Sequence, residues 1–420
     1  MTEPRPLAAA PAPGYSRATW IVLGLAVVLY YFRFRVDTVV PDAMMSLYLM
    51  SPDASAGACL MKGERLAACS TAFPYPPLFA LLTVPFTFLP MEARNIAWYA
   101  VLVAATYGCF RICEALVLAA FRVTREELTW VRVLSTLLSL KFVLSVLENQ
   151  AYDVLVFFFI LVGLQGLARD RTAAAASGLG TAVALKPTPL IMLAYALWLR
   201  NWKVFALGTG VCVLLSLLPD LLFRANYPGH GYLWTWVRDV AIGGVLGTTP
   251  DIYYPLMKEV NFLNQSLKSL VFMTLDGTGL AAHKRAILYG VYGVYAAVAL
   301  AILIRSAKAE GALLWGASIG VISMVLLSPV SSKSHFVVLL LPHMAIVAYL
   351  VKHPEARRAV VPLLCASFFL NSLVTRHVVG RGLAILMQSY GCITFGTLLL
   401  LAAVAVAVNQ SGKTASARTA

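Results

Sequence analysis

Long apolar runs, separated by short polar loops, follow one another along almost the whole chain. Most of these runs approach or exceed about 17 residues, the length that a helix needs to cross a bilayer. The pattern therefore predicts membrane-spanning helices over the ranges 19–34, 96–121, 130–147, 154–168, 205–223, 286–304, 312–327, 336–351, 360–373 and 390–408.

Three further apolar runs are shorter and cover 78–89, 173–185 and 189–199. Pro90 ends the first, and Lys186-Pro187-Thr188-Pro189 separates the other two. Lipid cannot satisfy free backbone N–H and C=O groups, so non-helical backbone at membrane depth must be buried in protein or face a wet cavity. We therefore expect these short, proline-broken helices to surround the cavity of the protein.

The charges between the runs suggest how the helices cross. We place the N-terminus inside and interpret 78–89 as a half-helix that returns to the side it left, which gives about twelve crossings and a C-terminus that is also inside. Basic residues then gather in the cytoplasmic loops, as the positive-inside rule requires: Arg122/Arg125, Arg169/Arg171, Arg200/Lys203, Arg305/Lys308 and Lys352/Arg357/Arg358.

Composition agrees with this class. The chain is 60% hydrophobic and 12% charged, whereas soluble domains average about 45–50% and about 25%. We expect an all-α polytopic membrane protein with one domain, 18–408, because no polar stretch is long enough to form a core of its own. This domain includes external loops 35–77 and 224–263. We expect a disordered cytoplasmic N-terminal tail at 1–17, without a signal peptide, and a cytoplasmic tail at 409–420.

The formal net charge of +14 has a membrane explanation. Lys and Arg lie mainly between apolar runs, where anionic lipid head groups attract them, so membrane lipids are the expected partner and nucleic acid is not. Seven cysteines are too few for a disulfide scaffold. Cys59 and Cys69 both fall in the first polar loop. If that loop faces an oxidising compartment, the two cysteines could form a disulfide.

Unusual polar residues gather on the external side of this topology. They are Asp42 in the first loop, Asn149 and Gln150 after the run 130–147, Lys186, Asn264 and Gln265 in the second loop, and Ser328, Lys333 and His335 between two late runs. A cavity with a carboxylate, amides, two lysines and a histidine can bind an anion and move a proton.

Each residue also has a structural interpretation. Asp42 follows Pro41 and could cap a helix N-terminus, although the same position keeps a carboxylate ionised and ready to act as a base. Lys186 could extend to the membrane interface, and the amides at Asn149 and Gln150 could simply end a helix. We find no metal-ligand cluster, GxGxxG or P-loop, so no cofactor and no nucleotide-bound donor is expected. Assistance by a divalent cation stays open.

The order of several motifs resembles glycosyltransferase family 87. Asp42 and Tyr48 precede Phe73-Pro74-Tyr75-Pro76-Pro77, which matches the Phe-x-Tyr-Pro-Pro of this family. Asn149-Gln150 lies near the Gly-Gln position of this family, with the glycine replaced. Further matches follow at Lys186-Pro187-Thr188-Pro189, at Asn264-Gln265-Ser266 and at Ser328-Pro329-Val330-Ser331. The last motif departs from the family, because only His335 remains where members often have a histidine pair, and Lys333 lies beside it.

The resemblance implies a GT-C-type bundle with half-helices and external interfacial helices. It implies an inverting transferase that moves a sugar from a polyprenyl-phosphate donor to a glycolipid or cell-envelope glycan acceptor. Mannose is the first expectation for the sugar, and arabinose or another sugar is the alternative. Asp42 would be the general base, with Asp37 as the alternative, and Lys186, Lys333 and His335 would bind the donor phosphate. Substrate contacts would come from Tyr48, Tyr75, Asn149, Gln150, Asn264, Gln265 and Ser328.

The expected location is the inner (plasma) membrane of a bacterium, with the active site facing the periplasm or exterior. A membrane transporter or flippase for a lipid-linked or anionic substrate is the main alternative, since such proteins also place broken helices and charges around a central cavity. An inverted repeat would favour that alternative, and the sequence contains none that we can detect.

Overall fold

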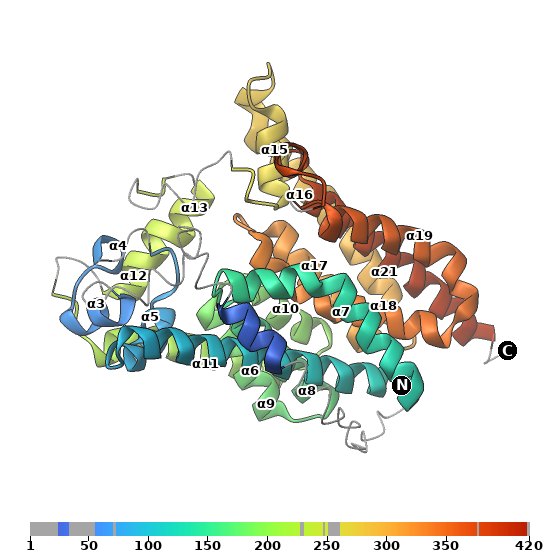
Figure 1. Cartoon of the computed structure of the whole chain (residues 1–420), viewed down its shortest axis with the longest axis horizontal. Helices are drawn as coiled ribbons and strands as arrows, with labels where there is room; N and C mark the ends of the chain where they lie inside the picture. The colour runs from blue at the N-terminus through green and yellow to red at the C-terminus, as the bar shows by residue number, and fades with distance from the viewer. Residues whose placement is uncertain are drawn as a thin grey trace.

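The computed structural model describes residues 24–32, 55–69, 73–226, 231–246, 248–250, 261–375 and 378–417. Within these ranges the chain forms helices and no strand (Figure 1). Six helical segments of the described part are long and apolar enough to cross a membrane. They belong to α6 (Met91–Phe121), α7 (Arg125–Glu148), α11 (Trp202–Leu222), α16 (Lys284–Ser306), η4 with α18 (Lys333–Leu339 and Leu340–Lys352) and α21 (Cys392–Ala417).

These segments confirm an all-α protein with several helices suited to a membrane, and the total of about twelve crossings stays a prediction. The shorter apolar helices also lie where the sequence predicts them. They are α5 (Pro77–Thr87), α8 (Asp153–Ala168), α9 (Thr172–Leu185), α10 (Leu190–Trp198) and α17 (Ala312–Leu327). The last helix, α21, continues to Ala417, beyond residue 408 where we expected a tail to begin.

Helices α8 and α9 pack with almost no space between their backbones. A Cβ atom added to Gly178 would lie 2.5 Å from the backbone nitrogen of Gly163, and one added to Gly166 would collide with the backbone of Ala175. Small residues at such positions let two helices approach closely in a membrane. This tight antiparallel hairpin brings the end of α9 back beside the start of α8.

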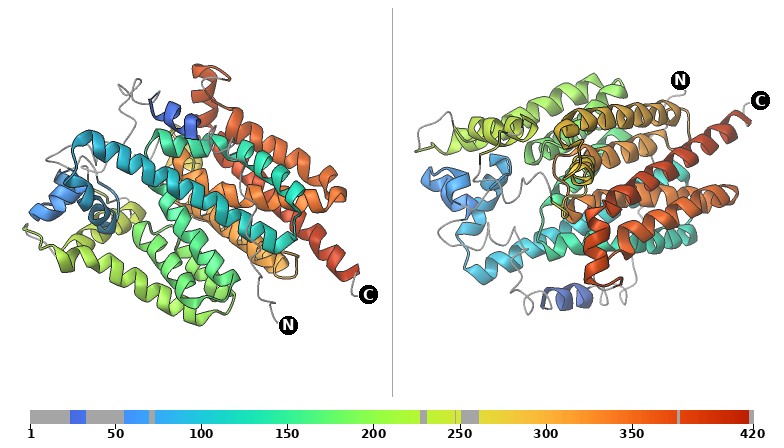
Figure 2. Two further views of the ribbon diagram at one scale, coloured as in Figure 1. Left: turned by 60° about the horizontal axis from the view of Figure 1, so that its bottom comes forward. Right: turned by 90° about the horizontal axis from the view of Figure 1, so that it is seen from above.

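The central helices surround a buried layer. Figure 2 shows α6 and α7 running alongside the orange helices α17 and α18, and α18 packs against both α6 and α7. α18 carries His343, whose Nδ1 lies 2.9 Å from the hydroxyl of Ser139 on α7, with both residues buried. Every residue of α18 from Leu340 to Leu350 is buried, so the apolar core of the described residues lies along this helix.

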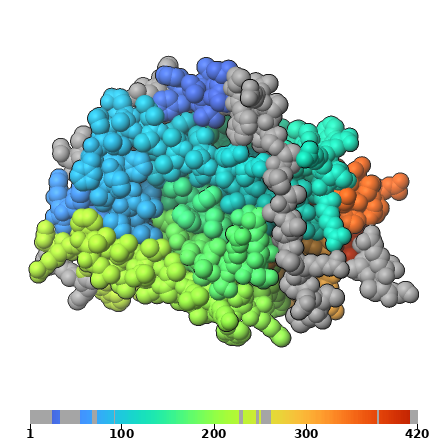
Figure 3. All heavy atoms as spheres, turned by 90° about the horizontal axis from the view of Figure 1, so that it is seen from below, coloured from blue at the N-terminus to red at the C-terminus, as the bar shows by residue number. Residues whose placement is uncertain are grey.

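A separate layer of short helices covers one end of the bundle (Figure 1). It contains α3 (Ala56–Lys62), α4 (Leu66–Cys69), α12 (Tyr232–Trp236), η1 (Val237–Ile242) and α13 (Gly243–Leu246). Seen from below, the blue region of α3–α5 lies against the yellow-green region of α11–α12 (Figure 3). We call this group the end layer; its helices come from the two predicted external loops.

An ion pair joins the two parts of the end layer. Nη2 of Arg65 lies 2.7 Å from Oδ2 of Asp239, and Nε of Arg238 lies 2.6 Å from Oδ1 of the same carboxylate. Burial alone would raise the pKa of Asp239, but the hydrogen bonds and positive charges of Arg238 and Arg65 hold that pKa below its ordinary value. Cys59 in α3 is disulfide-bonded, whereas the side chain of Cys69 lies outside the described residues.

The C-terminal part adds helices on the other side of the bundle. α19 (Arg357–Phe368) continues as the π-helix η6 (Phe369–Leu373) and packs against α21. Nζ of Lys141 in α7 donates to the carbonyl oxygen of Asn371 at 2.7 Å and so ties η6 to the centre. Two helices in this part were not predicted by the apolar pattern: α15 (Leu267–Leu275), which packs against α16, and α20 (Arg381–Ser389), which packs against α21.

Candidate functional site

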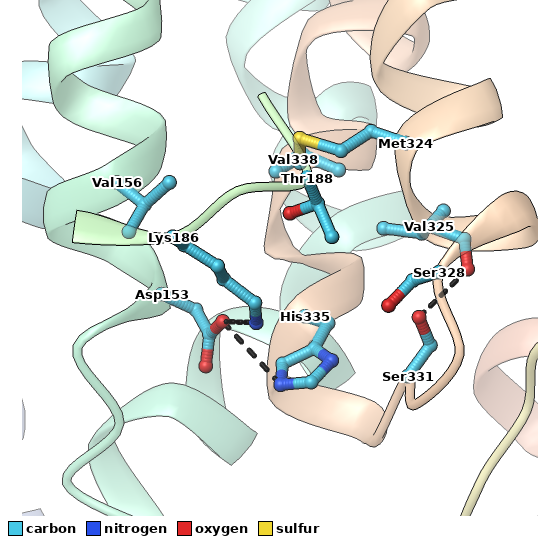
Figure 4. Close-up of a pocket in the computed structure, with 10 residues that line it drawn as sticks. All are labelled: Asp153, Val156, Lys186, Thr188, Met324, Val325, Ser328, Ser331, His335 and Val338. Atoms are coloured by element: carbon cyan, nitrogen blue, oxygen red, sulfur yellow. Dashed lines mark hydrogen bonds and ion pairs between the residues drawn. The ribbon is translucent and has the colours of Figure 1, made fainter. Parts of the chain in front are cut away.

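A small pocket lies where four helix ends meet (Figure 4). The start of α8, the end of α9, the end of α17 and the start of η4 each contribute to its walls. The lining residues are Asp153, Val156, Lys186, Thr188, Met324, Val325, Ser328, Ser331, His335 and Val338. Its cavity volume is only about 10 Å³, roughly the space of one water molecule, so the walls of the pocket lie close together in this structure.

Asp153 is the centre of this pocket. Nζ of Lys186 lies 2.7 Å from its Oδ1, and Nε2 of His335 lies 3.5 Å from the same oxygen (Figure 4). The side chains of Asp153, Lys186 and His335 are only 8%, 14% and 15% exposed. A carboxylate and its cationic partner thus meet almost out of water.

Local sequence explains how each side chain reaches this point. Asp153 is the first residue of α8, where the helix N-terminus favours a negative charge. Lys186 ends α9 in an extended conformation (φ −155°, ψ 131°), which the following Pro187 requires by excluding a helical conformation. The backbone N–H of Ser332 donates to Nδ1 of His335 at 3.2 Å and turns Nε2 toward Asp153.

The aromatic segment at residues 73–77 reaches the pocket through Tyr152. The ring of Tyr152 lies 5.0 Å from that of Tyr75 and 4.4 Å from that of Phe79, centroid to centroid. Nζ of Lys186 lies 6.0 Å from the centroid of the same ring. Tyr75 therefore does not contact Lys186 directly, because Tyr152 lies between the two side chains.

Asn264 and Gln265 hold the turn that carries Ser328. Nδ2 of Asn264 donates to the carbonyl of Pro329 at 3.0 Å, and Oδ1 of Asn264 accepts from the backbone N–H of Ser331 at 2.8 Å. The side-chain amide of Gln265 donates to the carbonyl of Gln388 and accepts from a backbone N–H of α21. Both amides are therefore bound to backbone and fix one wall of the pocket; direct contact with a substrate stays a prediction.

Ser328 lines the pocket, and its hydroxyl donates to the carbonyl of Val330 at 2.7 Å. Asn149 and Gln150 lie in the turn just before α8 and do not line the pocket. Nδ2 of Asn149 donates to Ser145 within its own helix. Gln150 has a left-handed backbone (φ 47°), and its buried Oε1 has no hydrogen-bond partner among the described residues.

The remaining predicted residues fall elsewhere. Lys333 begins η4 and does not line the pocket. Asp37, Asp42 and Tyr48 lie outside the described residues. The predicted base therefore stays a prediction, while the predicted phosphate ligands Lys186 and His335 do lie together.

Asp153 is the functional candidate that the sequence analysis missed. Two features of the sequence could have identified Asp153. Carboxylates are rare in this chain, with 19 Asp and Glu in 420 residues, and Asp153 begins an apolar helix on the side predicted to be external. Among the described residues, no group of three or more His, Cys, Asp or Glu side chains could hold a metal ion.

The comparisons with known proteins give one match. The family model described as Glycosyltransferase family 87 matches residues 73–329. No curated protein and no solved structure matches the chain. The matched range includes Asp153, Lys186 and Ser328 and ends shortly before His335.

Proposed function

Because this chain belongs to glycosyltransferase family 87, we propose that it moves a sugar from a polyprenyl-phosphate donor to a glycolipid or cell-envelope glycan acceptor, with inversion at the anomeric carbon. Family membership makes the protein a glycosyltransferase and speaks against the transporter or flippase alternative. Mannose is the first sugar to test, followed by arabinose.

One observation carries the choice of donor: Lys186 and His335 converge on a nearly water-free point at the end of apolar helices. When the sugar leaves, negative charge grows on the phosphate oxygens of the lipid. Fixed donors in a dry site, here the Lys186 ammonium and the Nε2–H of the His335 imidazole, stabilise such charge far better than water does. A phosphate that enters beside Lys186 would meet this arrangement, and its isoprenoid tail would remain in lipid.

The acceptor hydroxyl needs a base, and we assign that role to Asp42, with Asp37 as the alternative. A phosphate leaving group departs without a proton, so one carboxylate is sufficient, unlike the pair used in glycoside hydrolysis. Asp153 is less suited to the role, because the oxygen that faces Lys186 and His335 already accepts hydrogen bonds. We assign Asp153 the task of positioning these two side chains.

We also propose that the reaction takes place outside the cytoplasm. We propose about twelve crossings in a bacterial plasma membrane, with the pocket and the end layer on the periplasmic or exterior side. The four helix ends around the pocket and the end layer both belong to the side that the positive-inside rule assigns to the exterior. A lipid-bound donor suits this location, because nucleotide sugars are confined to the cytoplasm.

A donor screen tests the proposal. Membranes that contain the protein would be incubated with radiolabelled mannose or arabinose bound to polyprenyl phosphate, with the same sugars bound to nucleotides, and with extracted membrane glycolipids as acceptors. We expect transfer from a polyprenyl-phosphate donor only, and transfer about 10²–10³-fold slower in membranes that carry the Lys186→Met variant. Transfer from nucleotide sugars in the absence of lipid donors would overturn the proposal.

A further inference from the structure

The charged side chains around the pocket balance one another before a donor enters. The ionisable side chains among the described residues that line this pocket are Asp153, Lys186 and His335. Nδ1 of His335 accepts a hydrogen bond from the backbone N–H of Ser332 at 3.2 Å, so this imidazole is neutral and carries its proton on Nε2. One carboxylate and one ammonium remain, and their charges cancel.

Few hydrogen-bond donors of the pocket are left for a phosphate. An ammonium has three N–H groups, and one of those on Lys186 is bound to Oδ1 of Asp153 at 2.7 Å. Nε2 of His335 faces the same oxygen at the longer distance of 3.5 Å (Figure 4). The hydroxyls of Ser328 and Ser331 already donate to backbone carbonyls, both at 2.7 Å. The remaining N–H groups of Lys186 and His335 match the two non-bridging oxygens of one phosphodiester and leave none for a second phosphate.

The pocket as it stands is too small for a phosphate. Its cavity volume of about 10 Å³ is roughly the space of one water molecule. A donor phosphate therefore reaches Lys186 only by sharing its ammonium with Asp153 or by drawing that ammonium away. Asp153 is the first residue of α8, whose backbone packs directly on α9. The carboxylate consequently stays beside the phosphate that has entered.

The depth of the pocket strengthens the interactions between these charges. Helices α8, α9 and α17 contain 16, 14 and 16 residues, which correspond to about 21–24 Å at a rise of about 1.5 Å per residue. The hydrocarbon core of a bilayer is about 30 Å thick. In the proposed topology, helices of this length that reach the cytoplasmic face end below the outer face, and the pocket lies at those ends. Solvent and salt screen charges little at a buried site, so Asp153 strongly opposes any further negative charge.

We propose that Asp153 limits the donor to a single phosphate, so that the protein accepts sugars on polyprenyl monophosphate and excludes sugars on polyprenyl diphosphate. The proposal rests on the function proposed above and adds the residue that selects between two classes of lipid donor. A phosphodiester brings one negative charge, which shares the ammonium of Lys186 with Asp153. A diphosphate diester brings two charges, and the second meets no further cation in the described lining while Asp153 repels it.

The test compares the binding of two lipids that differ by one phosphate. Purified protein in lipid nanodiscs would be titrated with the monophosphate and the diphosphate of one short polyprenol, each carrying mannose or arabinose. We expect the unmodified protein to bind the monophosphate about tenfold or more tightly than the diphosphate, and Asp153→Asn to lower this ratio of Kd values about tenfold. Asp170→Asn removes an exposed carboxylate at the other end of the same hairpin and should leave the ratio unchanged. An equal ratio in folded Asp153→Asn and in the unmodified protein would overturn the proposal.

A second variant keeps the pair of Asp153 and Lys186 intact, in case Asp153→Asn does not fold. Thr188→Asp adds a carboxylate to the wall of the pocket, and Thr188→Asn is the uncharged control of similar size. The ratio of Kd values should rise about tenfold in Thr188→Asp, because the added charge repels the second phosphate more than the control does. A ratio that is the same in both Thr188 variants would also refute the selection by charge.

The same titrations distinguish this proposal from the function on which it rests. If both lipids bind equally well and the monophosphate supports transfer, the selection by Asp153 fails and the proposed function stands. If the monophosphate binds with the expected preference and no sugar is transferred, the proposed function fails and the selection stands. If neither lipid binds, both proposals are wrong.

Discussion

Nζ of Lys186 lies 2.7 Å from Oδ1 of Asp153, although 33 positions separate the two residues in the sequence. α8 leaves from Asp153 and α9 returns to Lys186, so an antiparallel hairpin closes the distance. Because Gly163 and Gly178 let the two backbones touch, the pair is set by rigid packing. The site therefore depends on helix packing as much as on its own side chains.

Lys186→Met should reduce transfer by about 10²–10³-fold, the usual loss when one donor to a developing negative charge is removed. Lys186→Arg is the conservative control and should retain part of the activity. Asp153→Asn should also lower transfer, since Lys186 and His335 lose the group that aligns them. The measurement is the initial rate of sugar transfer per amount of folded protein.

The double variant Lys186→Met/Asp153→Asn distinguishes catalysis from stability. Removing both charges of a buried pair is often close to neutral for folding, whereas removing one partner is costly. We expect the thermal unfolding midpoint of the double variant to recover toward that of the unmodified protein, with transfer still lost. Recovery of transfer together with stability would mean that the pair is structural only.

Asp42→Asn should lower transfer by about 10²–10⁴-fold, because an amide cannot take a proton from the acceptor hydroxyl. Asp37→Asn is the matched control in the same loop and should stay close to the unmodified rate. Binding of the polyprenyl-phosphate donor, measured separately, should survive both changes. Loss of transfer in Asp37→Asn alone would move the base to that residue, and full activity of both variants would remove the base from this loop.

The sequence predicted most of the helices because, in lipid, helix formation follows from apolar length alone. The range 312–327 coincides with α17, since Gly311 and Ser328-Pro329 mark its two ends. α20 was not predicted, because it lies in a short segment of mixed polarity between two apolar runs. Helix boundaries that depend on local composition can thus be predicted from the sequence, whereas those that depend on tertiary contacts cannot.

The site was predicted in part for the same reason. Topology alone could place Lys186, Ser328 and His335 at one end of the bundle. The pairing of Lys186 with Asp153, however, depends on how α8 and α9 are aligned along their axes. No local sequence pattern predicts this alignment. The motif at Asn264-Gln265 indicated an important position, but its hydrogen bonds to the backbone of Pro329 and Ser331 appear only in three dimensions.

Asn264→Leu tests whether that residue acts by positioning the pocket wall. The change leaves the backbone groups of Ser331 and Pro329 without their partners, each at about 1–3 kcal/mol. Asn201→Ala is the control for loss of a structural amide far from the pocket, because Asn201 caps the distant start of α11 through Val204 N–H, at a smaller cost of ~0.5–2 kcal/mol. Transfer per folded protein should fall only for Asn264→Leu. Equal effects of the two variants on transfer would reduce Asn264 to a general stabilising residue.

Glu114→Gln should strongly destabilise the bundle without a direct effect on chemistry. Glu114 is fully buried and receives two hydrogen bonds from Arg132 of α7, at 2.7 and 2.8 Å, and one from the more exposed Arg111 of its own helix at 3.3 Å. Breaking such a pair costs about 3–5 kcal/mol, while replacing both charges is far milder. The unfolding midpoint in detergent should therefore drop for Glu114→Gln and recover in Glu114→Leu/Arg132→Met. Transfer per folded protein should persist, since α7 separates this pair from the turn before Asp153. If Glu114→Gln were as stable as the unmodified protein, the expectation would be wrong.

The end layer should lose stability in acid through Asp239. Burial opposes ionisation of this carboxyl, but Arg238 and Arg65 hold its folded pKa below the ordinary value of 3.8. A depressed pKa stabilises the folded state above the ordinary value, and the contribution disappears as the pH falls through the lower, folded pKa. The unfolding midpoint of the unmodified protein should therefore exceed that of Asp239→Asn at pH 6, and the difference should shrink below about pH 4. Asp170→Asn, whose carboxyl lies in an exposed turn between α8 and α9, should show no comparable pH-dependent difference. A constant difference between the unmodified protein and Asp239→Asn from pH 6 to pH 3 would show that the Asp239 carboxylate does not carry this stability.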